Sequence, residues 1–230
     1  MSLGGSVTDE GFAIIPKVLT AKDVAELLAL LAKFPPQRSR AGARHVLSHA
    51  AVGPVAADLR LLAVARVVLG PAAFPFRATL FDKSATANWL VTWHQDTALP
   101  LLERRETAGW GPWSIKDGVQ YAHAPGAALE HVLALRLHLD DSTAENGPLR
   151  VVPGTHTLGV LTDEAVHDVA ARASAVDGLV DAGGVLAMRP LVIHASSKSR
   201  SALPRRVLHI EYAAHPQIAA PLELAIDSDR

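Results

Sequence analysis

The chain has 230 residues, of which 49% are apolar, 20% are charged and 5% are aromatic, enough to build one globular domain or at most two small ones. The 22 basic and 23 acidic side chains give a net charge of −1, which excludes the basic surface of a nucleic-acid-binding protein and a polybasic segment for anionic lipid. The absence of cysteine excludes disulfides, thiolate zinc sites, iron–sulfur clusters and cysteine nucleophiles.

The N-terminal segment predicts no targeting signal. Residues Met1–Lys17 lack a basic stretch followed by an apolar one, and no apolar run is long enough to cross a membrane. We therefore expect a soluble, cytoplasmic protein that binds a small molecule and neither a membrane nor nucleic acid. Nothing in the sequence specifies an oligomeric state.

Two helices are predicted before the first strand. Apolar residues recur at three- and four-residue spacing over Thr20–Lys33, with Thr20 as the N-cap and Pro35-Pro36 after the end. The same spacing over Pro54–Leu69 predicts a second helix, which Gly70 ends. A later helix is predicted over Thr162–Val176.

After these helices, short apolar segments alternate with Gly and Pro, which is typical of β-strands. Eight strands are expected, over Arg77–Lys83, Trp89–Trp93, Val119–Ala122, His131–Asp140, Leu149–Val152, Gly184–Met188, Leu191–His194 and Arg206–Ala213. Helices followed by about eight strands predict a mainly β domain with flanking helices, of a length that suits a single jelly roll.

We expect residues 1–230 to form a single domain in three parts. A helical part, residues 1–76, packs on a barrel core formed by residues 77–215, and residues 97–130 form an insertion in that core. The stretch Thr97–Pro125 carries Pro, Gly and two Trp and is interpreted as a long insertion rather than strand structure. Long ordered insertions in a compact domain serve as lids or binding loops.

The first group of residues that points to chemistry is His94-Gln95-Asp96, at the end of an apolar strand. Eleven histidines in a chain without cysteine make imidazole the metal ligand to examine first. Side chains two apart in an extended segment point to the same face, so His94 and Asp96 would lie side by side. The alternative is an exposed pair at a strand end.

The apolar run that ends in His194 supplies a third candidate ligand. Two imidazoles and one carboxylate on one face leave positions open, which is typical of non-haem Fe(II) oxygenases. A zinc site would use a fourth protein ligand or a hydrolytic water instead. Arg205, eleven residues after His194, directly precedes the last predicted strand, where it could bind a carboxylate through two guanidinium nitrogens; a solvated arginine at the barrel rim is the alternative.

Four motifs, taken in order, resemble the phytanoyl-CoA dioxygenase family over roughly Phe81–Ala213. They are His94-Gln95-Asp96, the segment from Glu145 to His156 (ENGPLRVVPGTH), His194-Ala195-Ser196 and Pro204-Arg205-Arg206. The resemblance implies a double-stranded β-helix, a jelly roll of the cupin type, and dependence on Fe(II), 2-oxoglutarate and O2.

The resemblance also implies roles for single residues. His94, Asp96 and His194 would be the iron ligands and catalytic centre, Arg205 would bind the distal carboxylate of 2-oxoglutarate, and Ser196 would assist with its hydroxyl. Family halogenases replace the carboxylate ligand by a small residue, so the presence of Asp96 implies a hydroxylase that acts on a small or medium organic molecule and releases succinate and CO2. Two alternatives stay open: a zinc or manganese jelly-roll hydrolase or isomerase, and a non-catalytic metal- or carbohydrate-binding jelly roll.

Further candidates for the cosubstrate or substrate pocket come from their positions beside these motifs. Lys83 could reach the C1 carboxylate of 2-oxoglutarate, with a surface lysine as the alternative. His209 and Glu211 share the strand face of Arg205 and could orient it. The tentative substrate-lining residues are Trp93, Trp110, Trp113, His123, Arg136 and His138. The tryptophans lie near the first ligand pair, with ordinary core packing as the alternative. Arg136 and His138 share one face of an apolar strand, with an outward-facing orientation as the alternative.

Overall fold

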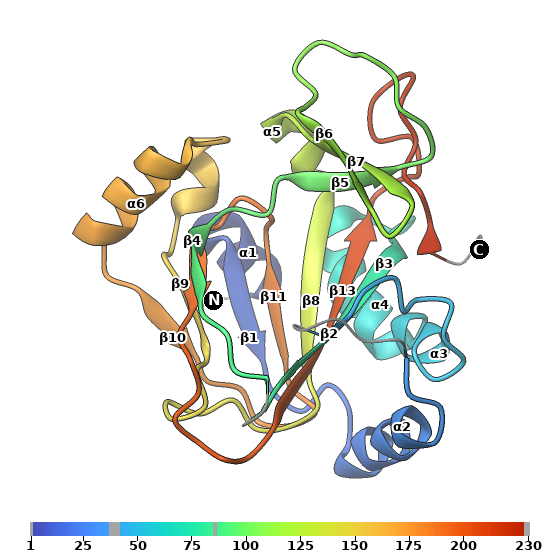
Figure 1. The fold of residues 1–230 in the computed structure, drawn as a ribbon, viewed down its shortest axis with the longest axis vertical. Coiled ribbons are helices and arrows are strands. Elements are labelled where there is room, and N and C mark those ends of the chain that lie inside the picture. Colours follow the sequence, from blue (N-terminus) through green and yellow to red (C-terminus); the bar gives the residue numbers. More distant parts are fainter. Residues whose placement is uncertain (1, 37–41, 85–86, 228–230) are drawn as a thin grey trace.

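The computed structural model describes residues 2–36, 42–84 and 87–227, and three antiparallel sheets make up its framework (Figure 1). The largest sheet has the order β1-β11-β8-β13-β3-β2, with bounds Phe12–Ile15, Val185–Met188, Val132–His138, Arg205–Ala213, Phe74–Lys83 and Gly42–Ala43. The second has the order β10-β9-β12-β4, with bounds Val176–Gly178, Leu149–Val151, His194–Ser196 and Val91–His94. These sheets form the predicted jelly roll.

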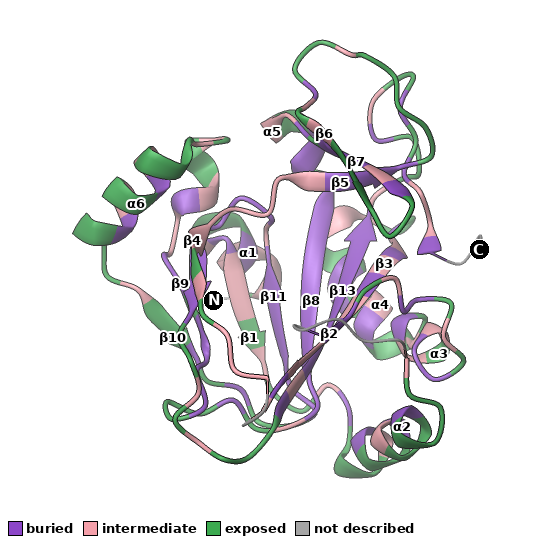
Figure 2. Cartoon of the chain, viewed as in Figure 1, coloured by how far each residue is buried: buried purple, intermediate pink, exposed green. Residues whose placement is uncertain are grey.

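Helices cover the outer face of the largest sheet: α1 (Leu3–Glu10), α2 (Ala21–Lys33), α3 (Gly53–Ala56) and α4 (Leu59–Leu69) (Figure 1). Alternate residues of the central strands, such as Leu135 and Leu208, join the helices in one apolar cluster. The other residues of the same strands, such as Arg136 and His209, face the interior of the barrel. The central strands are therefore buried on both faces, as Figure 2 shows.

The helix predictions need two corrections. Thr20 caps α2 as expected, through a capping box with Asp23. The helix expected over Pro54–Leu69 is divided into α3 and α4, because the Asp58 carboxylate accepts a hydrogen bond from the Arg60 backbone N–H and starts a new helix. The later helix, α6 (Asp163–Arg172), ends before Val176, which begins β10.

The strand prediction for Leu191–His194 is wrong. Residues 191–193 are a buried turn, and β12 begins at His194. The Thr155 hydroxyl accepts a hydrogen bond from the Ile193 N–H, so this apolar segment satisfies its backbone without a strand neighbour. The strand expected over Trp89–Trp93 is shifted and lies at Val91–His94.

The predicted insertion contains a third sheet. Its order is β5-β7-β6, with bounds Ala98–Leu101, Val119–His123 and Trp113–Lys116, and α5 (Gly126–Leu129) follows it. The interpretation of Thr97–Pro125 as non-strand structure is therefore wrong at β5 and β6. Figure 1 shows this sheet above the end of the barrel.

The first 76 residues contribute strands as well as helices. Strands β1 and β2 pair with β11 and β3 in the largest sheet, and residue 76 lies inside β3. Residues 1 and 37–41 of this part lie outside the described residues. Within the described part of the chain, no helix has the length and apolar character needed to cross a bilayer.

Candidate metal centre

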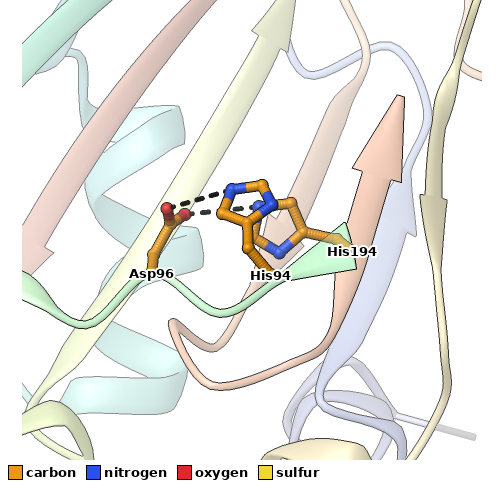
Figure 3. A group of neighbouring side chains, drawn as sticks. All are labelled: His94, Asp96 and His194. Atoms are coloured by element: carbon orange, nitrogen blue, oxygen red, sulfur yellow. Dashed lines mark ion pairs between the residues drawn. The ribbon is translucent and has the colours of Figure 1, made fainter. Parts of the chain in front are cut away.

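The structure brings His94, Asp96 and His194 together, although they come from two separate parts of the chain. His94 ends β4, Asp96 follows two residues later, and His194 begins β12 opposite His94 in the antiparallel pairing. One ligand atom from each residue lies within 4.8 Å of the other two. The Asp96 oxygens lie 3.7 Å from His94 Nε2 and 3.5 Å from His194 Nε2, as Figure 3 shows.

Hydrogen bonds to the backbone orient both imidazole rings. His94 Nδ1 lies 2.9 Å from the Thr92 carbonyl oxygen, and His194 Nδ1 lies 2.9 Å from the Val192 carbonyl oxygen. A carbonyl oxygen can only accept, so each Nδ1 carries the proton and each Nε2 presents a lone pair. Such bonds are the usual means by which proteins fix the tautomer and direction of a metal-binding histidine.

The electrostatics of the site favour the protonation states that a cation requires. Burial would raise the pKa of Asp96, but His194 and His94 outweigh it and hold that pKa below its usual range. Burial lowers the pKa of His194 to about 4, although Asp96 opposes the shift. At neutral pH Asp96 is therefore an anion and His194 a neutral ligand.

This donor set fits a metal with open coordination positions. In non-haem Fe(II) sites, two imidazole nitrogens and a carboxylate bind one face of the metal and leave the other positions open. Among the described residues, no fourth His, Asp or Glu joins the group, so the closed four-ligand shell of a structural zinc site is not formed.

A cavity of about 250 Å³ adjoins the three ligands. Its wall is unusually polar for a barrel interior and contains cations from several strands. The lining residues are Arg44, Arg77, Thr79, Phe81, Lys83, Trp89, Val91, His94, Asp96, Lys116, Tyr121, Arg136, Leu149, His194, Ser196, Arg205, His209 and Glu211.

One end of the cavity holds Arg205, Lys83 and Ser196. Arg205 lies opposite Lys83 in the pairing of β13 with β3. The Lys83 ammonium donates to Ser196 Oγ at 2.9 Å, and Arg205 Nε donates to the Asn146 carbonyl oxygen at 3.1 Å. Both cations are buried, and neither forms an ion pair with a described carboxylate.

Burial makes the charged forms of Lys83 and Arg205 less favourable than they are in water, as their lowered pKa values indicate. Burial, with repulsion from Arg205 and Arg136, lowers the pKa of Lys83 to about 8. Burial alone lowers the pKa of Arg205 to about 10. Buried cations are stable when an anion accompanies them, so this end of the cavity is suited to a carboxylate ligand.

Arg136 reaches the same cavity from β8, where it lies opposite His209 of β13. Its pKa is lowered to about 10 by burial and by Arg205, while Asp96 opposes the shift. One guanidinium nitrogen, Nη1, lies 3.1 Å from His209 Nδ1, whereas Nε has no partner among the described residues. Arg136 therefore faces the cavity, an orientation that the sequence left open. His138, on the same strand face, is also buried, but it does not line the cavity.

The other end of the cavity holds a buried ion pair. Two guanidinium nitrogens of Arg77 contact both oxygens of Glu211, with 2.6 Å between Nη2 and Oε1. Burial raises the pKa of Glu211, and Arg77 opposes that shift. The expectation that His209 and Glu211 orient Arg205 is wrong, because they contact Arg136 and Arg77 instead.

Four of the predicted substrate residues lie away from the cavity wall. Trp110 and Trp113 belong to the apolar cluster beneath the third sheet, and His123 is exposed with its Nδ1 2.6 Å from Thr97 Oγ1. Trp93 packs on the opposite face of β4 from His94, because neighbouring side chains on a strand alternate. The tryptophan that does line the cavity is Trp89.

Sequence reasoning missed several cavity residues, and four of them are charged or carry a hydroxyl on an aromatic ring: Arg44, Arg77, Lys116 and Tyr121. Arg77 could have been found, since it is six residues before Lys83 on a ten-residue strand and so shares its face. The other three reach the cavity from β7, from the end of β6 and from the segment after β2, and no periodicity links those segments to the barrel.

Comparison with known families agrees with this geometry. The model for the family described as "Phytanoyl-CoA dioxygenase (PhyH)" matches residues 7–207. The chain belongs to this family. The PhyH match extends well beyond the region of the resemblance at its N-terminal side and includes the three metal-centre residues and Arg205.

Two curated proteins are similar to this PhyH chain. An L-proline trans-4-hydroxylase of Streptomyces griseoviridis is 31% identical over 160 residues, 56% of this chain and 59% of that protein. An ectoine dioxygenase of Sphingopyxis alaskensis is 24% identical over 182 residues, 70% of this chain and 53% of that protein. The chain thus spans a little more than half the length of the curated relatives it matches.

Solved structures support the fold assignment for this PhyH chain. EctD from S. alaskensis, solved with 2-oxoglutarate and 5-hydroxyectoine, has a TM-score of 0.69 at 18% identity, over 99% of this chain and 86% of EctD. AviO1 from Streptomyces viridochromogenes has a TM-score of 0.64 at 24% identity, over 91% of this chain and 92% of AviO1. At these identities the structures show a shared fold.

Proposed function

We propose that this protein is an Fe(II)- and 2-oxoglutarate-dependent dioxygenase that hydroxylates a small organic molecule. The observation that carries the proposal is the position of the three-ligand face beside buried cations without a carboxylate partner among the described residues. A metal-binding jelly roll that hydrolyses or isomerises its substrate does not need such cations for its chemistry. A 2-oxoglutarate enzyme needs them, because its cosubstrate carries two carboxylates.

His94, Asp96 and His194 would hold the iron through two Nε2 atoms and a carboxylate oxygen. Bound Fe(II), with 2-oxoglutarate and O2, supplies the oxidation of a C–H bond to an alcohol, while the cosubstrate becomes succinate and CO2. The protein's own contribution is to keep both rings in the required tautomer and to keep Asp96 ionised. Because Asp96 occupies the carboxylate position, hydroxylation is the outcome we propose.

Arg205, Ser196 and Lys83 would bind the distal carboxylate of 2-oxoglutarate. The planar guanidinium can contact both carboxylate oxygens, and the Ser196 hydroxyl and Lys83 ammonium lie at the same end of the cavity. The sequence offered Lys83 as a candidate for the C1 carboxylate, with a surface lysine as the alternative. We assign the C1 carboxylate to Arg136, which lies opposite His209 and lines the same cavity as the three residues that would hold the iron.

The names of the relatives indicate the size and kind of substrate. Proline and ectoine are small molecules, and the cavity here, about 250 Å³, is below the usual range of about 300–1,000 Å³ for ligand pockets. We call the end of the cavity lined by the exposed residues Arg44 and Lys116 its open end. A small substrate that reaches the metal from this end is consistent with both observations.

Anaerobic reconstitution tests the proposal directly. We expect the metal-free protein, given Fe(II) and then 2-oxoglutarate, to develop the weak visible charge-transfer band of the iron–cosubstrate complex. The control is the same titration with succinate, which lacks the 2-oxo group and should give no band. Tight retention of zinc or manganese together with no band would favour the hydrolase, isomerase or binding-protein alternatives and reject the dioxygenase.

A further inference from the structure

The net positive charge of the cavity wall is not neutralised by the binding of iron and 2-oxoglutarate. Six cationic side chains and two carboxylates line it, an excess of four positive charges. Under the proposed function, one Fe(II) adds two positive charges and one 2-oxoglutarate adds two negative charges, so these additions cancel. The excess remains after both have bound, so the cavity still attracts a further anion.

Most of the cations already have a partner or a proposed one. Arg77 is paired with Glu211, and Lys83 and Arg205 lie together at the end suited to the distal carboxylate. Arg136 lines the cavity from β8 and is proposed for the C1 carboxylate. Among the cavity cations of the described chain, Arg44 and Lys116 are left without an assigned anion.

Arg44 and Lys116 stand at the open end of the cavity. Both side chains are exposed, whereas the other four cations are buried or half-buried. Lys116 ends β6, and its ammonium lies 4.7 Å from the centre of the Tyr121 ring. The Arg77 guanidinium lies 5.3 Å from the centre of that ring, so two cations contact one aromatic side chain.

The surroundings of Lys116 disfavour its positive charge. Partial desolvation lowers its pKa, and Arg77 and Arg44 lower it further, while the carboxylates Asp96 and Glu211 oppose the shift. Neither Lys116 nor Arg44 forms an ion pair with a carboxylate in the part of the chain that the structure describes. A bound anion would relieve this repulsion, as anions do in clefts lined by charges of one sign.

We infer that Arg44 and Lys116 bind a carboxylate group of the substrate at the open end of the cavity, so that the substrate is a small carboxylic acid. The inference rests on the proposed function and narrows its substrate class. It places the reacting carbon of the acid toward His94, Asp96 and His194, and its anionic group toward solvent. An arginine can contact a carboxylate through two nitrogens, and a lysine adds a point charge.

Matched acids and amides test this inference with simple compounds. The probes are L-proline, L-pipecolic acid, phenylacetic acid and hexanoic acid, each with its primary amide. Each is titrated anaerobically into protein loaded with Fe(II) and 2-oxoglutarate, and binding is followed by tryptophan fluorescence, since Trp89 lines the cavity. We expect at least one acid to bind at least tenfold more tightly than its amide.

Variants then test whether Arg44 and Lys116 cause the tighter binding of acids than of amides. In the double variant Arg44→Gln/Lys116→Gln, the ratio of acid affinity to amide affinity should fall close to one. The matched control, Lys22→Gln, changes an exposed lysine on α2, and it should keep the wild-type ratio. The variant Arg44→Gln/Lys116→Arg should regain part of the preference that the double variant Arg44→Gln/Lys116→Gln loses, because it carries a positive charge at position 116.

The inference is overturned if wild-type protein binds no acid of the set more tightly than its amide, or if the double variant keeps the wild-type ratio. A preference for phosphate monoesters over every acid of similar size would also overturn it. The charge-transfer band, recorded before any probe is added, separates the two levels: no band in wild-type protein rejects the proposed function, whereas a band without acid preference rejects only this inference.

Discussion

Arg205 shows how one residue can be tested apart from the metal. Its guanidinium is buried, and its hydrogen-bond partners are neutral oxygens, the Asn146 carbonyl and the Ser196 hydroxyl. Arg205→Ala should therefore weaken 2-oxoglutarate binding by about 10- to 100-fold, the loss expected for charge-assisted hydrogen bonds of about 1.5–3 kcal/mol. Iron affinity should stay near the wild-type value, because Arg205 contacts none of the three ligands.

Asp96→Ala should have the opposite effect, since it removes one of three metal ligands and leaves the basic end intact. Iron affinity, measured by competition with a coloured chelator, should fall more than about 100-fold, beyond the usual effect of residues that only orient ligands. Arg150→Ala is the matched control for Arg205: Arg150 lies on the other face of the small sheet, over the Trp93 ring. Equal effects of Arg205→Ala and Asp96→Ala on both ligands would contradict the separate roles.

At the scale of elements, the start of α4 gives a test of stability. The Asp58 carboxylate accepts a hydrogen bond from the Arg60 N–H at 2.8 Å, and the Arg60 side chain also contacts Asp23 on α2. Asp58→Ala should lower the free energy of unfolding by about 1 kcal/mol and Tm by about 2–4 °C. Calorimetry should show a smaller change for Asp168→Ala, whose partner on α6 is the exposed Arg172. Equal losses would show that the cap does not stabilise α4.

The same helix illustrates what periodicity predicts and what it misses. Apolar spacing marked the region of α3 and α4 correctly. It does not show that the two helices divide at Asp58, because that division depends on a hydrogen bond from a backbone N–H to the Asp58 side chain. Strands flanked by clear alternation, such as β3 and β13, were predicted to within three residues at each end. The run Leu191–Ile193 was not, because burial alone gives it an apolar sequence and a turn satisfies its backbone.

At the scale of the whole molecule, the two walls of the barrel have different chemical roles. The small sheet presents the candidate metal ligands His94 and His194 from β4 and β12, while the large sheet presents cations from β3, β8 and β13. The residues that the sequence identified, His94, His194 and Arg205, lie in motifs of adjacent residues. Arg44 and Lys116 could not be found that way, since the folding of distant segments over the barrel end brings them to the cavity.

The buried polar interior makes global stability depend on pH. His138 is 1% exposed, and neither ring nitrogen has a partner among the described residues. Burial, followed by repulsion from Arg136 and Arg205, lowers its pKa to about 3. The unfolded chain therefore takes up a proton near pH 6.5 that the folded protein cannot accept until about pH 3, and stability falls as pH falls through that window.

Replacing His138 with leucine removes this proton uptake and leaves the other titrating groups in place. Between pH 7 and pH 5, metal-free wild-type protein should lose about 2 kcal/mol more unfolding free energy than His138→Leu, since each pH unit below 6.5 costs up to about 1.4 kcal/mol for one such histidine. Urea unfolding at the two pH values measures the difference. His167→Leu, on the exposed surface of α6, should keep the wild-type pH dependence. If His138→Leu keeps it as well, His138 is able to accept a proton in the folded state, and the barrel interior is more hydrated than its burial indicates.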